Sequence, residues 1–159
     1  MRKDNRGLSL LELVVSIAIL GMVSAILVSF MSTGSAMFKR VSTDVSLQMQ
    51  SQMLATQLTE YIIDCNESIE FSGGQGAARL TVRNTTPDGI VEHRFDWNGA
   101  TGIVTYNDKD EMAEYVSFLG VDITGNTVTL TLHLAKDEDF YVSTHTVALR
   151  NDSVRIPTP

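Results

Sequence analysis

The stretch Arg6-Gly7-Leu8-Ser9-Leu10-Leu11-Glu12 stands immediately before an uncharged apolar run from Leu13 to about Met31. A run of about 19 residues, at a rise of about 1.5 Å per residue, forms a helix of about 30 Å, which is the thickness of the hydrocarbon core of a bilayer. The sequence therefore predicts a helix that spans a membrane once, over residues 8–31.

The charges that flank the run predict its orientation. Arg2, Lys3 and Arg6 precede it and are opposed only by Asp4. Because basic flanks are retained in the cytoplasm, we expect everything beyond the run to lie outside it. The prediction is a single-pass protein of the cell (inner) membrane with its C-terminal domain outside the cytoplasm.

Glu12 is the only charged residue between Arg6 and Lys39. A carboxylate carried into hydrocarbon costs about 2.5–3.5 kcal/mol at the centre of a helix, and less near its end. One interpretation is a capping box, because Ser9 and Glu12 have the S-x-x-E spacing in which each side chain bonds the backbone N–H of the other residue. The charge would also lie at the positive end of the helix dipole.

A second interpretation gives Glu12 a partner in another subunit. A peptidase that cut between Gly7 and Leu8 would create an α-amine with a pKa of about 8, roughly one helical turn from Glu12. In an assembly of identically oriented helices, this amine can pair with Glu12 of a neighbour, because a lone charge is far more costly than a matched pair in low dielectric. Such a contact would fix the axial register of the helices.

These residues resemble a known signal. The sequence from Gly7 to Glu12, with its short basic leader and apolar helix, is similar to the class III signal of type IV prepilins and type II secretion pseudopilins. The family pattern is Gly, usually Phe, then Thr or Ser, Leu, an aliphatic residue and Glu. Leu8 in place of Phe is the main departure, and the family tolerates it.

The resemblance implies that residues 1–7 are a leader, which a prepilin peptidase removes by cutting after Gly7. It also implies N-methylation of Leu8 and a docking role for Glu12 during assembly. The implied partners are other pilin or pseudopilin subunits, the prepilin peptidase, an inner-membrane assembly platform and membrane lipid. The implied filament would serve type II secretion, DNA uptake in competence, or a type IV pilus.

An ordinary secretory signal is the rival interpretation of the N-terminus. Leu13–Leu20 would then be its apolar core and Val23-Ser24-Ala25 its cleavage site, which would release a soluble domain that starts at Ile26. However, Glu12 would lie without purpose in the apolar core, and the hydrophobic run continues past the supposed cut. The pattern favours the prepilin signal, and the alternative is a membrane-anchored or secreted β-rich binding domain that does not polymerise.

Composition limits the exported part to one small domain, since about 100 residues lie beyond the membrane segment and its helical extension. A cut after Gly7 removes three of the 12 basic residues and one of the 19 acidic ones, which changes the net charge from −7 to −9. An acidic domain argues against binding to nucleic acid. Cys65 is the only cysteine, which excludes an internal disulfide, and we expect it to be a half-buried residue at a helix end.

The helix is expected to continue as an amphipathic extension over residues 32–66. Proline is absent from this stretch, and apolar residues recur near a spacing of four. Because they hold no clean heptad, a coiled coil is disfavoured, and we expect a following sheet to cover the stripe and the methionines to pack in the core. The expected stripe is Val41, Val45, Met49 and Met53, followed after a shift by Leu58 and Ile62.

Residues 67–151 show the alternation of an antiparallel sheet. The segment Thr86-Pro87-Asp88-Gly89 predicts a turn, because proline presets φ and glycine supplies a positive φ. Matching the apolar faces across this turn sets the register of the two flanking strands. The expected pairs are Val82 with His93, Leu80 with Phe95, Arg83 with Glu92 and Arg79 with Asp96.

Further strands are expected over residues 103–106, 115–123, 127–135 and 141–149, with Val128, Leu130, Leu132 and Leu134 on one face. Gly73-Gly74-Gln75-Gly76 is expected to be a flexible loop, and residues 152–159 a flexible tail. The segments Leu119-Gly120-Val121 and Thr146–Asn151 look like the ending of minor pseudopilins of the J type and related minor pilins. That likeness is weaker than the N-terminal one.

Nothing in the residue pattern predicts catalysis, a metal or a cofactor. His93, His133 and His145 lie on separate strands without cysteines or paired carboxylates at metal spacing, and His93 is expected to be a hydrogen-bonded core residue. The acidic segment Asn107–Glu111 invites comparison with the calcium loop of some pseudopilins, but it lacks the regular ligand spacing and the closing glutamate. We expect it, and Asp137-Glu138-Asp139, to be solvated loops.

The sequence as a whole predicts an α+β, pilin-like subunit. One long N-terminal helix would span the membrane with its first half and pack on an antiparallel β-sheet with its second half. The predicted function is structural and not enzymatic, as a minor or initiating building block of a type IV filament.

Overall fold

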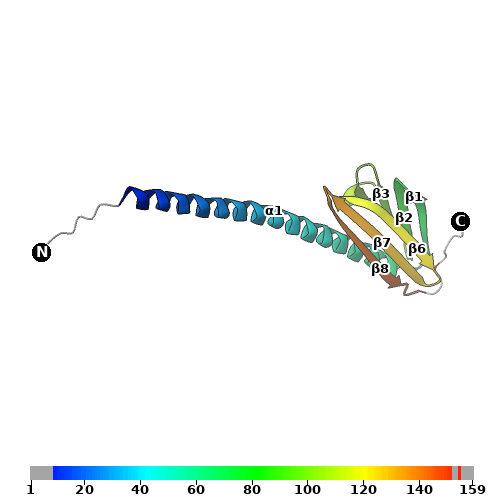
Figure 1. Cartoon of the computed structure of the whole chain (residues 1–159). Coiled ribbons are helices and arrows are strands. Elements are labelled where there is room, and N and C mark those ends of the chain that lie inside the picture. Colours follow the sequence, from blue (N-terminus) through cyan, green and yellow to red (C-terminus); the bar gives the residue numbers. More distant parts are fainter. Residues whose placement is uncertain (1–8, 152–153, 155–159) are drawn as a thin grey trace. The chain divides into compact units, whose positions relative to one another are not determined.

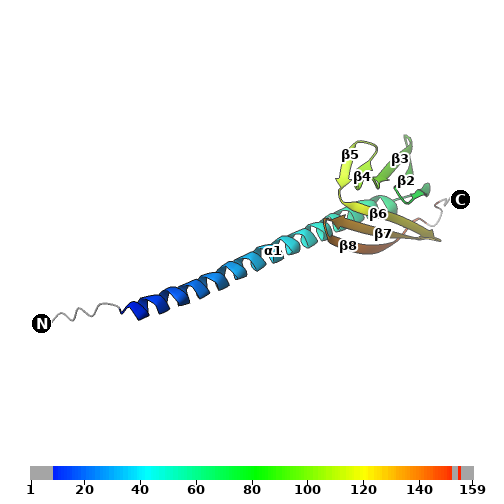
Figure 2. The ribbon, with the colours of Figure 1, turned by 45° about the horizontal axis from the view of Figure 1, so that its top comes forward.

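The computed structural model describes residues 9–151 and 154 of the chain. They fall into two compact units, divided between Val41 and Ser42 inside helix α1 (Leu10–Ile63). The first unit contains the N-terminal part of α1, and the second contains the rest of α1 and eight strands (Figures 1 and 2). The predicted fold class, α+β with a long N-terminal helix that packs on antiparallel strands, is confirmed.

The strands form two antiparallel sheets, where one was expected. Strands β1 to β5 make a five-stranded sheet in sequence order, and β6, β7 and β8 make a three-stranded sheet. Between the sheets, Tyr115 has a φ of 61°, a left-handed conformation that cannot continue a strand. The strands are β1 (Ser68–Gly74), β2 (Ala77–Thr86), β3 (Gly89–Asn98), β4 (Ile103–Tyr106), β5 (Asp110–Ala113), β6 (Val116–Thr124), β7 (Thr127–Lys136) and β8 (Asp139–Ala148).

The predicted register of β2 and β3 is confirmed at all four pairs. Pairing continues to Thr86 and Gly89, so the turn itself consists of Pro87 and Asp88, and Gly89 has the expected positive φ. The register also brings opposite charges together on the polar face, where Arg83 Nε lies 2.8 Å from Glu92 Oε2. Turn chemistry and face matching therefore select the same alignment.

Two edge strands were not predicted. Gly73 and Gly74 belong to β1 and pair with Ala78 and Ala77, so the expectation of a flexible loop there is wrong for these two glycines. Asp110 and the residue after it belong to β5, which shortens the expected acidic loop. Pairing with a neighbouring strand has overridden the poor β propensity of glycine and aspartate at both positions.

One hydrophobic core joins α1 to both sheets. The apolar face predicted for β7 is confirmed, since Val128, Leu130, Leu132 and Leu134 are all fully buried. Trp97 of β3 also links the two sheets, because its Nε1 donates a hydrogen bond to the carbonyl oxygen of Val116 in β6, at 2.8 Å. The helix contributes Leu47, Leu54, Ala55, Leu58 and Ile62 to this core.

The stripe predicted to face the sheets is wrong in its N-terminal part. Val45, Met49 and Met53 are 52%, 60% and 54% exposed, and Val41 is exposed as well. The residues that face the sheets are spaced by four, three, four and four, as in Leu47, Ser51, Leu54, Leu58 and Ile62. This spacing keeps close to the helical repeat of about 3.6 residues, whereas a uniform spacing of four drifts by about 40° at each step.

Substitutions at two adjacent residues will test this assignment. Leu54→Ala should lower the free energy of unfolding by about 2–5 kcal/mol, because it removes a fully buried side chain and leaves a cavity. Met53→Ala should change it by no more than about 0.5 kcal/mol, because Met53 is exposed. Urea unfolding of the chain in detergent, followed by the fluorescence of Trp97, measures both. Equal losses would contradict the assigned orientation of the helix.

Cys65 is fully buried, so the expectation of a half-buried residue is wrong. Its thiol donates a hydrogen bond to the carbonyl oxygen of Ser68 at 3.3 Å. Burial raises the pKa of the Cys65 thiol, which keeps the group protonated and poorly nucleophilic. Cys65 is therefore a packing residue that follows the end of α1.

Candidate functional site: the N-terminal end of helix α1

Ser9 caps the beginning of α1. Its hydroxyl oxygen accepts a hydrogen bond from the backbone N–H of Glu12 at 3.3 Å, and its carbonyl oxygen accepts one from the N–H of Leu13 at 3.1 Å. This is the arrangement of a serine N-cap, in which the side chain satisfies one of the free N–H groups of the first turn. Gly7 and Leu8, the predicted cleavage and methylation positions, lie outside the described residues.

Glu12 lies in the first turn of α1, and it is exposed. Of the two bonds that the capping interpretation predicts, the structure shows the one from the Glu12 N–H to the Ser9 hydroxyl. A carboxylate in the first turn is favoured by the positive end of the helix dipole. The Glu12 carboxylate is exposed and is not buried in the core of its own domain. Its predicted role in docking another subunit stays a prediction.

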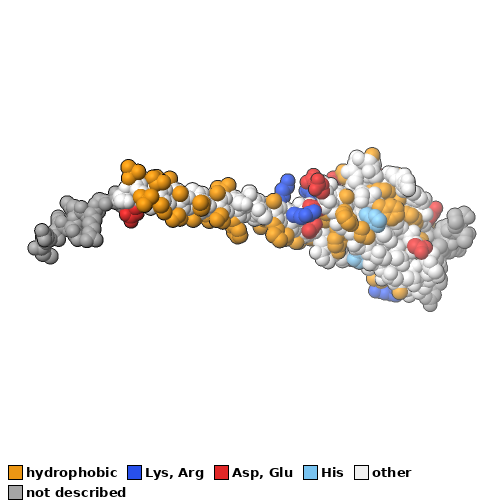
Figure 3. All heavy atoms as spheres, in the orientation of Figure 1, with side chains coloured by type: hydrophobic (Ala, Val, Ile, Leu, Met, Phe, Trp, Pro, Cys, Tyr) orange, Lys and Arg blue, Asp and Glu red, His pale blue; other side chains and the backbone are white. Residues whose placement is uncertain are grey.

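The helix that follows is apolar on all sides. Its first part is exposed from Leu10 to Met31, and hydrophobic side chains cover it (Figure 3). By length and composition, α1 is long and apolar enough to cross a membrane. A helix without a polar face is expected in a bilayer or among other helices, because it cannot be stable in water on its own. This segment fits a membrane anchor.

Hydroxyl groups in this part of α1 bond to the helix backbone. Ser16 donates to the carbonyl oxygen of Glu12 at 2.7 Å, and Ser24 donates to that of Leu20 at 2.8 Å. Thr33 makes the same type of bond to Ser29 at 3.0 Å. These residues therefore present no unsatisfied donor to an apolar environment, where such a donor would be costly.

Residues 2–28 match the family model of the prokaryotic N-terminal methylation motif. The N-terminal segment of the chain is prepilin-like. The matched residues include Gly7, Leu8 and Glu12. The motif is characteristic of type IV prepilins and pseudopilins, a family whose members are processed by a prepilin peptidase and associate with other pilin subunits. No curated protein matches the chain, and no solved structure matches it either.

In the described part of the chain, the three histidines do not gather with other potential ligands into a metal site. His93 lies on β3, where its Nδ1 is 2.6 Å from the Tyr106 hydroxyl and its ring lies 4.7 Å from that of Tyr61. Burial lowers the pKa of His93, which favours the neutral ring. The expectation that His93 is hydrogen-bonded is confirmed, although it is only partly buried. His133 and His145 lie on β7 and β8.

The acidic segments do not assemble a metal site in the part of the chain that the structure describes. Within residues 9–151, no group of three His, Cys, Asp or Glu side chains is placed to hold a metal ion. In the segment Asn107–Glu111, Asp108 pairs with Arg94 instead, with a distance of 2.7 Å between Oδ2 and Nη2. Asn107 caps the backbone N–H of Arg94 at 2.9 Å. This segment thus fastens the β4–β5 turn to β3.

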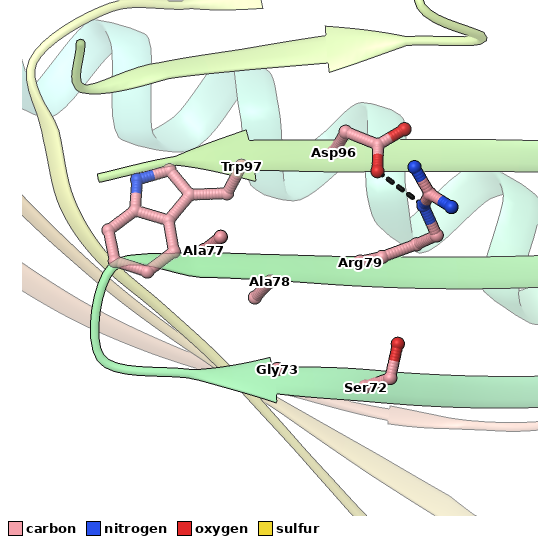
Figure 4. A pocket seen from close by; sticks show the side chains of 7 residues that line it. All are labelled: Ser72, Gly73, Ala77, Ala78, Arg79, Asp96 and Trp97. Atoms are coloured by element: carbon pink, nitrogen blue, oxygen red, sulfur yellow. Dashed lines mark hydrogen bonds and ion pairs between the residues drawn. The ribbon is translucent and has the colours of Figure 1, made fainter. Parts of the chain in front are cut away.

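A hollow of about 300 Å³ lies across β1, β2 and β3 (Figure 4). Arg79 of β2 and Asp96 of β3 point toward each other at its rim and form an ion pair. The Arg79 side chain is 48% exposed, so this pair adds little stability. The hollow is lined by Ser72, Gly73, Ala77, Ala78, Arg79, Asp96 and Trp97.

Proposed function

We propose that this prepilin-like chain is a structural subunit of a type IV filament, in a minor or initiating position. The observation that carries the proposal is the coincidence of three features at one end of α1. The methylation motif covers residues 2–28, Ser9 caps the helix, and Glu12 is the one acidic residue in the first turn of an exposed apolar segment.

The proposed roles follow the order of these residues along the chain. Cleavage after Gly7 removes the leader, residues 1–7, and leaves Leu8 as the N-methylated first residue. Its amine then pairs with Glu12 of a neighbouring subunit, about one turn along the parallel helix. In this proposal, residues 8–31 form the membrane segment and residues 32–66 the helical extension, within which α1 ends at Ile63. Residues 67–151 form the β domain and residues 152–159 the tail.

Before assembly, the proposed subunit is held in the inner membrane with its domain outside the cytoplasm. Its partners are other pilin or pseudopilin subunits, the prepilin peptidase, the assembly platform and lipid. The filament would belong to a type II secretion pseudopilus, a DNA-uptake pilus or a type IV pilus. The segments Leu119-Gly120-Val121 and Thr146–Asn151 look like those of J-type minor pseudopilins and related minor pilins, which supports a minor position and does not select one of these three systems.

Mass spectrometry of the intact N-terminus tests the proposal. Chain purified from membranes of a host with a prepilin peptidase is expected to begin with methylated Leu8. A chain that begins at Ile26 would support a secreted domain, and one that retains Met1 would support a simple membrane anchor. Either of these results would overturn the proposal.

A further inference from the structure

We propose that the outer edge of strand β8 binds an extended segment of another polypeptide, which adds to the three-stranded sheet as a fourth, antiparallel strand. In the described part of the chain, β8 pairs with β7 along one side only and is the last strand of its sheet. Figures 1 and 2 both show it at the margin of that sheet. This role goes beyond the proposed function, which concerns the N-terminal end of α1.

The main chain of β8 directs a regular row of hydrogen-bonding groups to this outer edge. Leu149 continues the register in which Ala148 faces Thr127, and its N–H donates to the carbonyl oxygen of Asn126 at 2.9 Å. Bonded and non-bonded pairs alternate along an antiparallel ladder, so every second residue of β8 turns its N–H and C=O away from β7. These outward groups belong to Phe140, Val142, Thr144, Thr146 and Ala148.

The spacing of these groups determines what fits the edge. They recur every second residue, or about every 6.8 Å, and donors alternate with acceptors. Another extended main chain carries complementary groups at the same spacing, which is how strand addition obtains its affinity. Lipid headgroups and nucleic acids are bound chiefly through lysine and arginine, and neither residue occurs from Phe140 to Leu149.

The other three sheet edges carry features that hinder the addition of a strand. Strand β1 has Glu70 and ends in two glycines. Strand β5 is only four residues long and begins with Asp110 and Glu111. Strand β6 has an irregular register between Val116 and Phe118. Charges, short length and bulges are the usual means by which edge strands avoid pairing with other chains.

Strand β8 lacks these protective features. It is ten residues long and pairs with β7 without a shift in register. Aspartate, glutamate and proline are absent from Phe140 to Leu149 as well. The outward side chains are aromatic, β-branched or small, and Phe140 and Val142 are 77% and 49% exposed. A long, uncharged edge with high β propensity is a template for another strand.

Charges at the two ends of β8 indicate the direction of the added segment. Asp137, Glu138 and Asp139 lie at the beginning of the strand, and Arg150 lies just beyond its end. The Arg150 side chain is 75% exposed although it pairs with Asp64. An antiparallel segment with an acidic residue first and a basic residue last therefore meets opposite charge at both ends. Antiparallel pairing is also slightly more stable than parallel pairing.

A synthetic peptide with this chemistry tests the proposal. It has nine residues, begins with glutamate, ends with lysine and alternates threonine with valine between them. Fluorescence anisotropy of the labelled peptide is measured against the full chain in lipid nanodiscs, and empty nanodiscs give the background. We expect saturable binding. A peptide with proline at its two central threonines lacks main-chain donors, and should bind at least about tenfold more weakly. Exchange of the terminal glutamate and lysine should weaken binding about threefold.

Hydrogen exchange measured by NMR locates the bound peptide. The amides of Val142, Thr144 and Thr146 should exchange at least about tenfold more slowly when the peptide is present, because their N–H groups acquire acceptors. The amides of Ser143 and His145 already face β7, so their exchange should not change. Protection along a different sheet edge would overturn the assignment of β8.

A proline in β8 tests the edge from the side of the protein. Thr144→Pro removes one outward N–H at the centre of the strand, and proline is tolerated in an edge strand where the N–H has no partner strand. The variant should unfold at the same urea concentration and bind the peptide at least about tenfold more weakly. If it does not fold, Thr144→Lys replaces it, because lysine on an edge strand opposes pairing. Thr131→Lys, directly opposite on β7, is its matched control and should bind normally.

Four other results would overturn the proposal. They are absence of peptide binding above the empty nanodiscs, equal binding of the proline-containing peptide, and a dimer of the chain that protects the same three amides without peptide. The fourth is loss of that protection, or stronger peptide binding, when residues 152–159 are removed, which would assign the edge to the chain's own tail. The proposed function is independent of all four, because it is tested at Leu8 and Glu12.

Discussion

Replacing Gly7 with tryptophan should leave the chain at its precursor length, with Met1 as its first residue. We expect almost complete loss of processing, because the bulky indole would stand at the bond that the peptidase must bind and cut. The precursor should still insert in the membrane, since the apolar run from Leu13 to Met31 is unchanged. Immunoblotting and intact-mass measurement of the membrane fraction give the result.

The control for this variant is Ile17→Trp, which adds the same bulk at an exposed position inside the apolar segment. It should be processed normally. Mature-sized protein from Gly7→Trp would rule out the proposed cut. A defect in both variants would show that bulk anywhere near the N-terminus is harmful, and would leave Gly7 without a special role.

Exchanging Glu12 for glutamine should allow processing, insertion and folding but lower the incorporation of the subunit into filaments by at least tenfold, or about 1.4 kcal/mol. Glutamine can replace glutamate in a capping box, so the end of the helix is preserved. What the variant loses is the charge that would pair with the new α-amine of a neighbour in low dielectric. The fraction of the chain in sheared or purified filaments measures the effect.

Two further variants separate docking from capping. Ser9→Ala removes the bond between the Ser9 hydroxyl and the Glu12 N–H, and should cost the helix about 1 kcal/mol without preventing assembly. Glu12→Asp retains the charge and should restore part of the incorporation. If Glu12→Gln assembles normally while Ser9→Ala does not, the carboxylate serves the cap alone and the docking role is wrong.

The register of β2 and β3 could be predicted because two independent constraints agree. The turn at Pro87 and Asp88 fixes the length of the connection, and Leu80 and Phe95 must share the buried face. Strands β1 and β5 could not be found in this way. They contain glycine or acidic residues and lie at the sheet edges, where pairing with one neighbour decides the structure and local composition gives no signal.

The orientation of α1 was missed for a geometric reason. A uniform spacing of four selects Val45, Met49 and Met53, but the sheets cover the row that runs from Leu47 through Leu54 to Ile62. Average spacing closer to 3.6 identifies the buried row, and this test could have been applied to the sequence. A helix with two apolar faces gives two valid stripes, however, and only packing shows which of them the domain itself uses.

For the candidate site, the sequence predicts more than the structure can test. The cap at Ser9 was predicted from spacing and is confirmed, because it is local to four residues. The roles proposed for Gly7, Leu8 and the Glu12 carboxylate would involve a peptidase, a methyl donor and another subunit. A single chain contains none of these partners, so its packing cannot reveal them.

The intrahelical bonds of Ser16, Ser24 and Thr33 bear on how the anchor moves between environments. Because these hydroxyls bond to their own helix, the segment can leave lipid and enter a bundle of similar helices without breaking a polar contact. Lipid and such a bundle are also almost equally apolar. Extraction from the bilayer would then be close to isoenergetic for this part of the chain.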